Sequence, residues 1–365
     1  MKSIFLFLLF LICNNTLLAS ELNFTRGELE KKWKKRILFL LNKKKLPKID
    51  MEASITISQI EESFPEVLAT YDKLGLALSS FDGYQRPKDG SKGYRWSNYI
   101  IDLTNNYPQY IIPTVNGGTS KNWTKGKTGK NSFINQLENE IQTGKYFNMG
   151  ELEFTHYMSS KQCEKKAKHR HIHLNLNSSN SKRVFALSEK YNVPFVIHLE
   201  PEDHNIDELD EILKEFPNAK LIWAHFGQLR QPELQKKFNP ETVENILTRH
   251  SNLYFDLATG HPNRKYKCSG KNNNKTLLGD TIIWEENNGK QQNKLKKKWK
   301  EILIKFSDRF VFATDYGGGR KPLDEYLTKK INNFNNIIND LPNEAKHNIA
   351  YKNAWYLLTG KKWNQ

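Results

Sequence analysis

Short apolar runs recur along this chain and alternate with amphipathic segments. Eight runs rich in β-branched and aromatic residues cover residues 48–54, 74–83, 109–117, 150–157, 194–200, 220–227, 252–259 and 309–316. The segments between them place apolar residues at helical spacing, as in SKRVFALSEKYN and IDELDEILKEFP. Buried strands that alternate with amphipathic helices indicate βα units and a parallel sheet. Eight such units in succession predict an α/β protein with a closed (β/α)₈ barrel. No G-x-G-x-x-G motif follows any of the strands, which removes the usual support for an open dinucleotide-binding sheet.

The N-terminus has the pattern of a secretory signal peptide. Lys2 precedes the apolar run IFLFLLFLI, and the segment ends in a small residue at Ala19. This stretch is too short and wrongly flanked for a membrane span, so we expect cleavage near Ala19 or Ser20. Ile12, the residue before Cys13, is too bulky for a typical lipoprotein cleavage site. The sequence therefore predicts a soluble exported protein, periplasmic or secreted.

We divide the chain into a signal peptide at residues 1–19, an N-terminal helical extension at residues 20–46 and a barrel domain at residues 47–365. In the extension, TRGELEKKWKKRILFLL reads as an amphipathic helix with Thr25 as N-cap and Glu28 three residues later. Two long connections, after the fourth and the seventh strand, are expected on the C-terminal face of the barrel, where such loops form lids and substrate walls.

Composition narrows the classes of partner. The formal net charge of +16 could attract nucleic acid or an anionic surface. However, the lysine runs have helical spacing typical of solvated faces, and no aromatic-basic module is present, so we expect no specific nucleic-acid partner. Oligomeric state does not follow from the sequence. Cys163 and Cys268 are too few for a Cys-based zinc site, and the sequence permits a disulfide between them without showing that they meet.

Three strands end in residues that can bind a metal. PFVIHLE contains His198, LIWAHFG contains His225 and RFVFATDY contains Asp315. A single histidine in a core strand is usually structural, but the C-terminal ends of parallel barrel strands meet at one mouth, where sites are built. Two imidazoles and a carboxylate gathered there are suited to a divalent metal.

Further polar residues are expected around the same mouth. Glu151 and Glu153 alternate on one strand, and Glu153 is nearer its C-terminal end, which makes it the preferred ligand, acid/base or substrate candidate. Asp256 is expected to orient a neighbour or to contact substrate. Arg320, after three glycines, is a candidate for binding an anionic substrate, although a surface arginine is an equal alternative. In the run KHRHIHLNL, alternating histidines are more often solvated than metal-binding, and His173 is the one expected to reach the mouth.

The order of these segments resembles the amidohydrolase superfamily. The motifs V-P-F-V-I-H, L-I-W-A-H-F-G, N-L-Y-F-D and F-A-T-D, followed by the ending YKNAWYLLTG, are similar to the amidohydrolase-related group of metal-dependent TIM-barrel hydrolases, which also includes decarboxylases. The resemblance covers the chain from about Leu46. It implies a metal ligand at His198, a ligand or catalytic imidazole at His225, and a ligand that is also the general base at Asp315.

The first strand departs from the family pattern. The family usually has Asp-x-His-x-His there, and this chain reads Asp50-Met51-Glu52-Ala53-Ser54. Glu52 can replace the first imidazole, whereas Ser54 is a poor ligand because its hydroxyl is neutral. We therefore expect one divalent ion, zinc or manganese, held by Glu52, His198 and Asp315, with His225 or Glu153 as a further candidate.

These assignments predict one main function and leave two alternatives. The main prediction is an exported hydrolase of small molecules, in which a metal-activated water attacks an amide, ester or lactone carbonyl. Asp315 would accept the proton of the water and His225 would stabilise the oxyanion. The alternatives are a non-oxidative decarboxylase with the same site and a metal-free barrel that binds a ligand without turnover.

Overall fold

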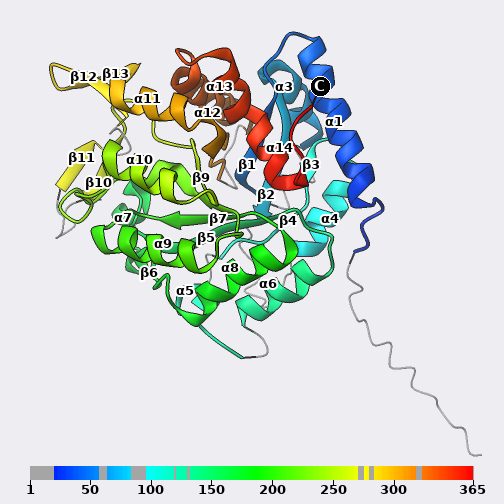
Figure 1. Cartoon of the computed structure of the whole chain (residues 1–365), viewed down its shortest axis with the longest axis horizontal. Coiled ribbons are helices and arrows are strands. Elements are labelled where there is room, and N and C mark those ends of the chain that lie inside the picture. The colour runs from blue at the N-terminus through cyan, green and yellow to red at the C-terminus, as the bar shows by residue number, and fades with distance from the viewer. Residues whose placement is uncertain are drawn as a thin grey trace, which may run out of the picture.

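Parallel strands form the centre of the molecule, with helices around them (Figure 1). The computed structural model describes residues 20–56, 64–83, 96–118, 121–129, 132–269, 275–278, 283–317 and 323–364. The strands of the barrel are β1 (Lys48–Ile55), β2 (Leu76–Gly83), β3 (Ile111–Ile112), β4 (Thr114–Val115), β5 (Asn148–His156), β7 (Phe195–Leu199), β8 (Leu221–Trp223), β9 (Leu253–Asp256) and β14 (Phe310–Val311). Each of the eight predicted strand segments overlaps one of these strands or, for residues 109–117, two.

The strands pair in chain order and in parallel. β1 pairs with β2, β2 with β3, and β4 with β5, and the ladder continues through β7, β8 and β9 to β14. β3 and β4 are two parts of one barrel strand on either side of Pro113, which has no N–H to donate. The Pro113 carbonyl still accepts the Phe147 N–H at 2.9 Å.

Backbone hydrogen bonds between the first and the last strand close the ring. The Met51 N–H donates to the Phe312 carbonyl at 3.1 Å, and the Ser54 N–H donates to the Tyr316 carbonyl at 2.7 Å. Ala53 and Tyr316 form a parallel bridge. Together with the pairs between β2 and β3 and between β4 and β5, these contacts confirm the predicted (β/α)₈ barrel.

Helices cover the outside of the barrel. They follow the strands as α3 (Phe64–Leu74), α4 (Trp96–Asn106), α5 (Lys121–Thr124), α6 (Phe133–Gln142), α8 (Ser179–Tyr191), α9 (Asp203–Glu215), α10 (Pro240–Arg249), α11 (Lys297–Lys305) and α12 (Leu323–Ile338). The chain ends in α13 (Asn343–His347), the π-helical turn η4 (Asn348–Lys352) and α14 (Asn353–Thr359). Their apolar faces and the strands share one hydrophobic core.

The N-terminal extension packs against the N-terminal ends of the barrel strands. α1 (Arg26–Asn42) begins with the predicted capping box of Thr25 and Glu28. The buried Trp33 packs edge-on against Phe147, just before β5, and Arg36 donates to the carbonyl of Leu76, the first residue of β2. α1 therefore covers the end of the barrel opposite the mouth, and Figure 1 shows it beside α14.

The two long connections carry structure of their own. The connection after β5 contains α7 (Ser160–Glu164), the 3₁₀ turn η1 (Lys168–Arg170) and β6 (Ile172–His173), which pairs with β5. The connection after β9 contains two antiparallel hairpins, one of β10 (Lys265–Ser269) and β11 (Lys275–Leu278), the other of β12 (Trp284–Asn287) and β13 (Lys290–Leu295). The 3₁₀ turn η3 (Ser307–Arg309) leads into β14.

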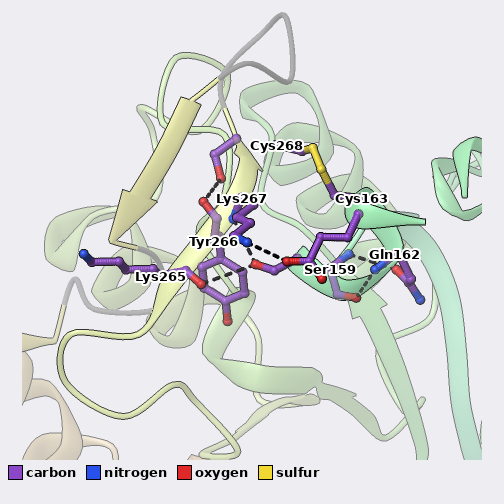
Figure 2. The surroundings of a disulfide bond; sticks show 10 residues. Ser159, Gln162, Cys163, Lys265, Tyr266, Lys267 and Cys268 are labelled. Carbon is purple, nitrogen blue, oxygen red and sulfur yellow. Dashed lines mark hydrogen bonds and ion pairs between the residues drawn. A yellow bond between two sulfur atoms is a disulfide. The ribbon is translucent and has the colours of Figure 1, made fainter. Parts of the chain in front are cut away.

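A disulfide joins these two connections. Cys163 on α7 is bonded to Cys268 on β10, with the two Cα atoms 6.1 Å apart (Figure 2). Beside it, the Lys267 N–H donates to Ser160 Oγ at 2.9 Å, and the Lys267 ammonium lies 2.5 Å from Glu164. The disulfide and these contacts thus hold the connection after β5 and the connection after β9 together.

Residues 1–19 and Arg320 lie outside the described residues. Within the part that the structure describes, no helix combines the length and the apolar character that a membrane crossing requires.

Candidate metal centre

The carboxylate of Glu151, on β5, lies between the imidazoles of His198 and His225. Its Oε1 atom is 2.8 Å from His198 Nδ1 and 3.0 Å from His225 Nε2. His198 is the fourth residue of β7. His225 comes two residues after Trp223, the last residue of β8. Both imidazoles are buried. Two imidazole nitrogens and one carboxylate oxygen that converge in this way form a donor set suited to zinc or manganese.

A left-handed turn after β8 places His225. The turn η2 (Ala224–Gly227) has φ values of 58° at His225 and 50° at Phe226. A side chain in this region costs on the order of 1–2 kcal/mol per residue, so the surrounding contacts must hold the turn. Asp256, at the end of β9, does so because its Oδ1 accepts the His225 backbone N–H at 2.8 Å.

Phe226 anchors the same turn from the core side. Its buried ring packs against Phe255 and Trp299, with ring centroids 5.2 and 5.1 Å away. At Gly227, where φ is 80°, a Cβ would come within 2.7 Å of the Phe238 ring, so only glycine fits. The H-F-G sequence therefore turns the imidazole toward the barrel axis while the phenyl ring stays in the core.

The second nitrogen of each imidazole faces another buried carboxylate. His225 Nδ1 lies 3.5 Å from Glu52 Oε2, and His198 Nε2 lies 3.6 Å from Glu200 Oε1. Among the described residues, neither nitrogen has a hydrogen-bond partner, nor does Glu52 Oε2. Buried polar atoms without partners are costly. These unpartnered atoms around a two-nitrogen, one-oxygen donor set fit a bound cation.

The site contains more buried carboxylates than buried cations. Burial raises the pKa of Asp50 and Glu153 to about 7 and that of Asp256 to about 6, and burial together with neighbouring carboxylates holds the pKa of Glu52 well above its usual range. Such shifts show that additional negative charge is unfavourable there. A divalent cation would relieve this repulsion.

The pKa of Glu151 is lowered and that of His198 is raised, against the effect of burial, because the two side chains face each other. Burial alone would raise the pKa of Glu151, but hydrogen bonds from His198 and His225 hold it well below its usual range. Burial alone would lower the pKa of His198, but the hydrogen bond to Glu151 and the nearby carboxylate of Glu200 raise it to about 9. The negative charge of Glu151 and the positive charge of His198 stabilise each other. A bound cation would take the place of the positive charge on His198.

The sequence-predicted ligands divide into two groups. His198 and His225, both predicted as ligands, lie together at Glu151. Glu52 belongs to a second group of carboxylates near His225, together with Asp256. Asp315 has φ 45°, its backbone N–H donates to the Glu52 carbonyl at 3.1 Å, and its carboxylate lies 3.1 Å from the Lys330 ammonium. Within the described residues, Asp315 joins neither group of convergent donor atoms.

The predicted substrate-binding residues have other partners in the structure. The buried Glu153 forms an ion pair with Arg170 of η1, so the sequence-based preference for Glu153 over Glu151 as ligand does not match the geometry. Asp256 is fully buried and accepts two backbone N–H groups, which fits the predicted orienting role and not a substrate contact. The half-exposed side chain of His173 has Nδ1 4.0 Å from Glu202 Oε1.

The sequence ranked one functional candidate too low and did not indicate another. Glu151 was placed below Glu153 because it is farther from the strand end, yet the imidazoles meet at its depth in the barrel. Glu200 was not singled out. One signal could have found it, since it follows His198 at the two-residue spacing that puts side chains on one face of a strand.

Comparison with known proteins agrees with this geometry. The family model described as Amidohydrolase matches residues 166–358, which is more than half of the chain. The chain belongs to the amidohydrolase family. The matched part of this amidohydrolase includes His198, His225 and Asp315, whereas Glu52 and Glu151 lie before it.

Solved structures that this chain resembles do so at low sequence identity. One is an uncharacterized TIM-barrel protein from Bordetella bronchiseptica, with 14% identity, a TM-score of 0.49 and coverage of 91% of this chain and 93% of that one. A putative amidohydrolase from Staphylococcus aureus has 12% identity, a TM-score of 0.47 and coverage of 86% and 99%. The 2,6-dihydroxybenzoate decarboxylase from Rhizobium has 11% identity, a TM-score of 0.46 and coverage of 86% and 98%. Similarities of this size carry no information on the reaction. Among curated proteins, none matches this amidohydrolase.

Proposed function

We propose that this protein is a metal-dependent hydrolase of the amidohydrolase type that cleaves an amide, ester or lactone. One observation carries the proposal, namely the convergence of Glu151 Oε1 with His198 Nδ1 and His225 Nε2 inside the barrel. These three residues would hold one divalent ion, with zinc and manganese as the ions best suited to the donors.

A divalent ion bound there supplies Lewis-acid chemistry, which lowers the pKa of a water to about 7 and polarises a carbonyl oxygen. The residues of the chain supply position and proton transfer. Glu151 holds the two imidazoles at fixed separation. Asp315, whose side chain is about one-third exposed, is the carboxylate that can take a proton and exchange it with solvent. Lys330 fixes the orientation of that carboxylate through its contact with Oδ2.

Metal content tests the proposed site. The purified protein, loaded with Zn²⁺ or Mn²⁺ and dialysed, should retain about one ion per chain by elemental analysis. Glu151→Gln should lose it, because the amide removes the only charged donor of the set. Glu153→Gln is the matched control, since Glu153 lies two residues along the same strand and should leave metal content unchanged. Wild-type protein without metal after loading would favour the metal-free ligand-binding barrel.

Product analysis tests the reaction class. The loaded enzyme should release acid and amine or alcohol from members of a panel of amides, esters and lactones, and Asp315→Asn should slow this turnover by at least about 100-fold, the usual contribution of a general base. Release of CO₂ from carboxylated aromatics, with no hydrolysis across the panel, would replace the hydrolase by the decarboxylase.

Export is a separate part of the proposal. It is supported by the leader pattern of residues 1–19 and by the disulfide between Cys163 and Cys268, a bond that persists in oxidising compartments. N-terminal sequencing of protein from a fractionated host should find mature chains that begin near Ser20. Chains that begin at Met1 in the cytosolic fraction would contradict it.

A further inference from the structure

A buried ion pair lies directly behind His198. Glu200 follows His198 by two residues, and its side chain is completely buried. Its Oε1 accepts the Tyr157 backbone N–H at 2.9 Å and pairs with the guanidinium of Arg230, which is itself 3% exposed. These two contacts fix the Glu200 carboxylate in one place.

From that place, Glu200 faces the nitrogen of His198 that points away from Glu151. His198 Nε2 has no hydrogen-bond partner within the described part of the chain, and Glu200 Oε1 lies 3.6 Å from it. This separation exceeds a hydrogen bond, and a small rotation of the ring would close it. When an ion is bound, a proton on Nε2 that points to Glu200 leaves the lone pair of Nδ1 directed at the ion-binding position.

We propose that Glu200, held by Arg230, is the positioning residue that sets the tautomer and ring orientation of His198. The inference rests on the proposed metal-binding function. Carboxylates behind a metal-binding histidine commonly act in this way, and their loss typically weakens metal binding by about 10–100-fold. Arg230 holds the carboxylate in position through its ion pair, and a carboxylate buried without a cation would be unfavourable.

The repeat of the arrangement at His225 supports the inference. His225 turns Nε2 toward Glu151 and Nδ1 toward Glu52, and Glu52 is buried as Glu200 is. Among the residues that the structure describes, the ion-pair partner of Glu52 is His225, and no arginine pairs with it. The His198 side is therefore the one in which the orienting carboxylate is itself fixed by a cation and a backbone N–H.

The test compares Zn²⁺ affinity by chelator competition in the intact protein. Glu200→Gln should weaken Zn²⁺ binding by about 10–100-fold. The control is Glu202→Gln, two residues along. Glu202 bonds to Tyr157 Oη and contacts no imidazole of the candidate centre, so this variant should bind Zn²⁺ as tightly as wild type. Wild-type protein that binds no Zn²⁺ would defeat the proposed function, whereas tight Zn²⁺ binding by both variants would defeat only the positioning role.

A second variant guards against a folding defect. Removing Glu200 alone leaves Arg230 buried without a counter-ion, so Glu200→Gln can unfold the protein. The double variant Glu200→Gln/Arg230→Met removes both charges and should remain folded by circular dichroism. If Glu200 orients His198, the double variant still loses affinity, and ¹H–¹⁵N NMR of the Zn²⁺-loaded protein shows a solvent-protected Nε2–H signal of His198 in wild type that is lost in the variant. Wild-type affinity and a retained Nε2–H signal in the double variant would overturn the proposal.

Discussion

Asp256 Oδ1 accepts the backbone N–H of His225 at 2.8 Å and so joins the end of β9 to the turn that follows its neighbour β8. The same oxygen accepts the Ala258 N–H at 3.0 Å. One buried carboxylate oxygen thus determines where the left-handed turn begins and where the imidazole points.

This relationship predicts a graded response to substitution. Asp256→Ala leaves two backbone N–H groups without their acceptor and should lower the free energy of unfolding by about 1–3 kcal/mol, with weaker Zn²⁺ binding. Asp256→Asn keeps one acceptor oxygen and should cost less on both counts. Urea denaturation of metal-free protein and Zn²⁺ titration measure the two effects. If the alanine variant and wild type had the same unfolding free energy and the same Zn²⁺ affinity, the turn would not depend on Asp256.

Glu52 can be tested as ligand against orienting residue. In either role, Glu52→Gln should weaken metal binding by about tenfold or more. The absorption spectrum of the Co²⁺-loaded protein separates the two roles. An orienting Glu52 leaves the band positions and intensities unchanged, because the ligands of the ion stay the same. A changed coordination geometry in the variant would instead support the assignment of Glu52 as a ligand, as the sequence predicted.

The disulfide should contribute strongly to stability. Cys163 and Cys268 are 105 residues apart, and a cross-link that closes a long loop stabilises a protein by about 2–4 kcal/mol. Cys163→Ser/Cys268→Ser should therefore unfold at lower urea concentration than oxidised wild type. Wild type treated with a reductant serves as the control and should match the double variant. No difference between oxidised and reduced wild type would mean that hydrogen bonds alone hold the two connections together.

Acid stability should depend on Asp210, far from the candidate centre. Burial alone would raise the pKa of Asp210, but hydrogen bonds from Lys214, His250 and Arg249 lower it well below the usual range. A carboxyl whose pKa is depressed by folding stabilises the protein above its unfolded pKa of about 4, and this contribution disappears as the pH falls. Asp210→Asn should thus have a lower Tm than wild type at pH 7, with the difference shrinking toward pH 3. A difference that is constant with pH would exclude this origin.

Periodicity was sufficient to predict the barrel, because a strand buried on both faces leaves a continuous apolar run. It predicted the strand that contains His198 within one residue at each end, with β7 at Phe195–Leu199. It did not show that Pro113 divides one strand into two, since the apolar run continues across the proline. It also did not show that Lys265–Ser269 forms a hairpin strand, because its partner Lys275–Leu278 lies in a segment rich in Asn and Lys.

The site was harder to predict than the fold. Strand ends indicated His198 and His225 correctly as neighbours, since parallel strands bring their C-terminal ends together. The choice between Glu151 and Glu153 depends on how deep in the barrel the imidazoles meet. It also depends on Arg170, in the connection after β5, which forms an ion pair with Glu153. Neither the depth nor the ion pair can be predicted from the spacing of residues along one strand.

The bonds that join the first strand to the last impose an order on assembly. Asp50 Oδ2 accepts the hydroxyl of Thr314 at 2.6 Å, and these residues are 264 positions apart. During synthesis, β1 emerges long before the residues that complete it, so until then the sheet has two open edges able to pair with other chains. A chain that stops before Phe310 would keep those edges open and would be expected to aggregate. The chemistry of this protein therefore becomes available only after its last strand has been made.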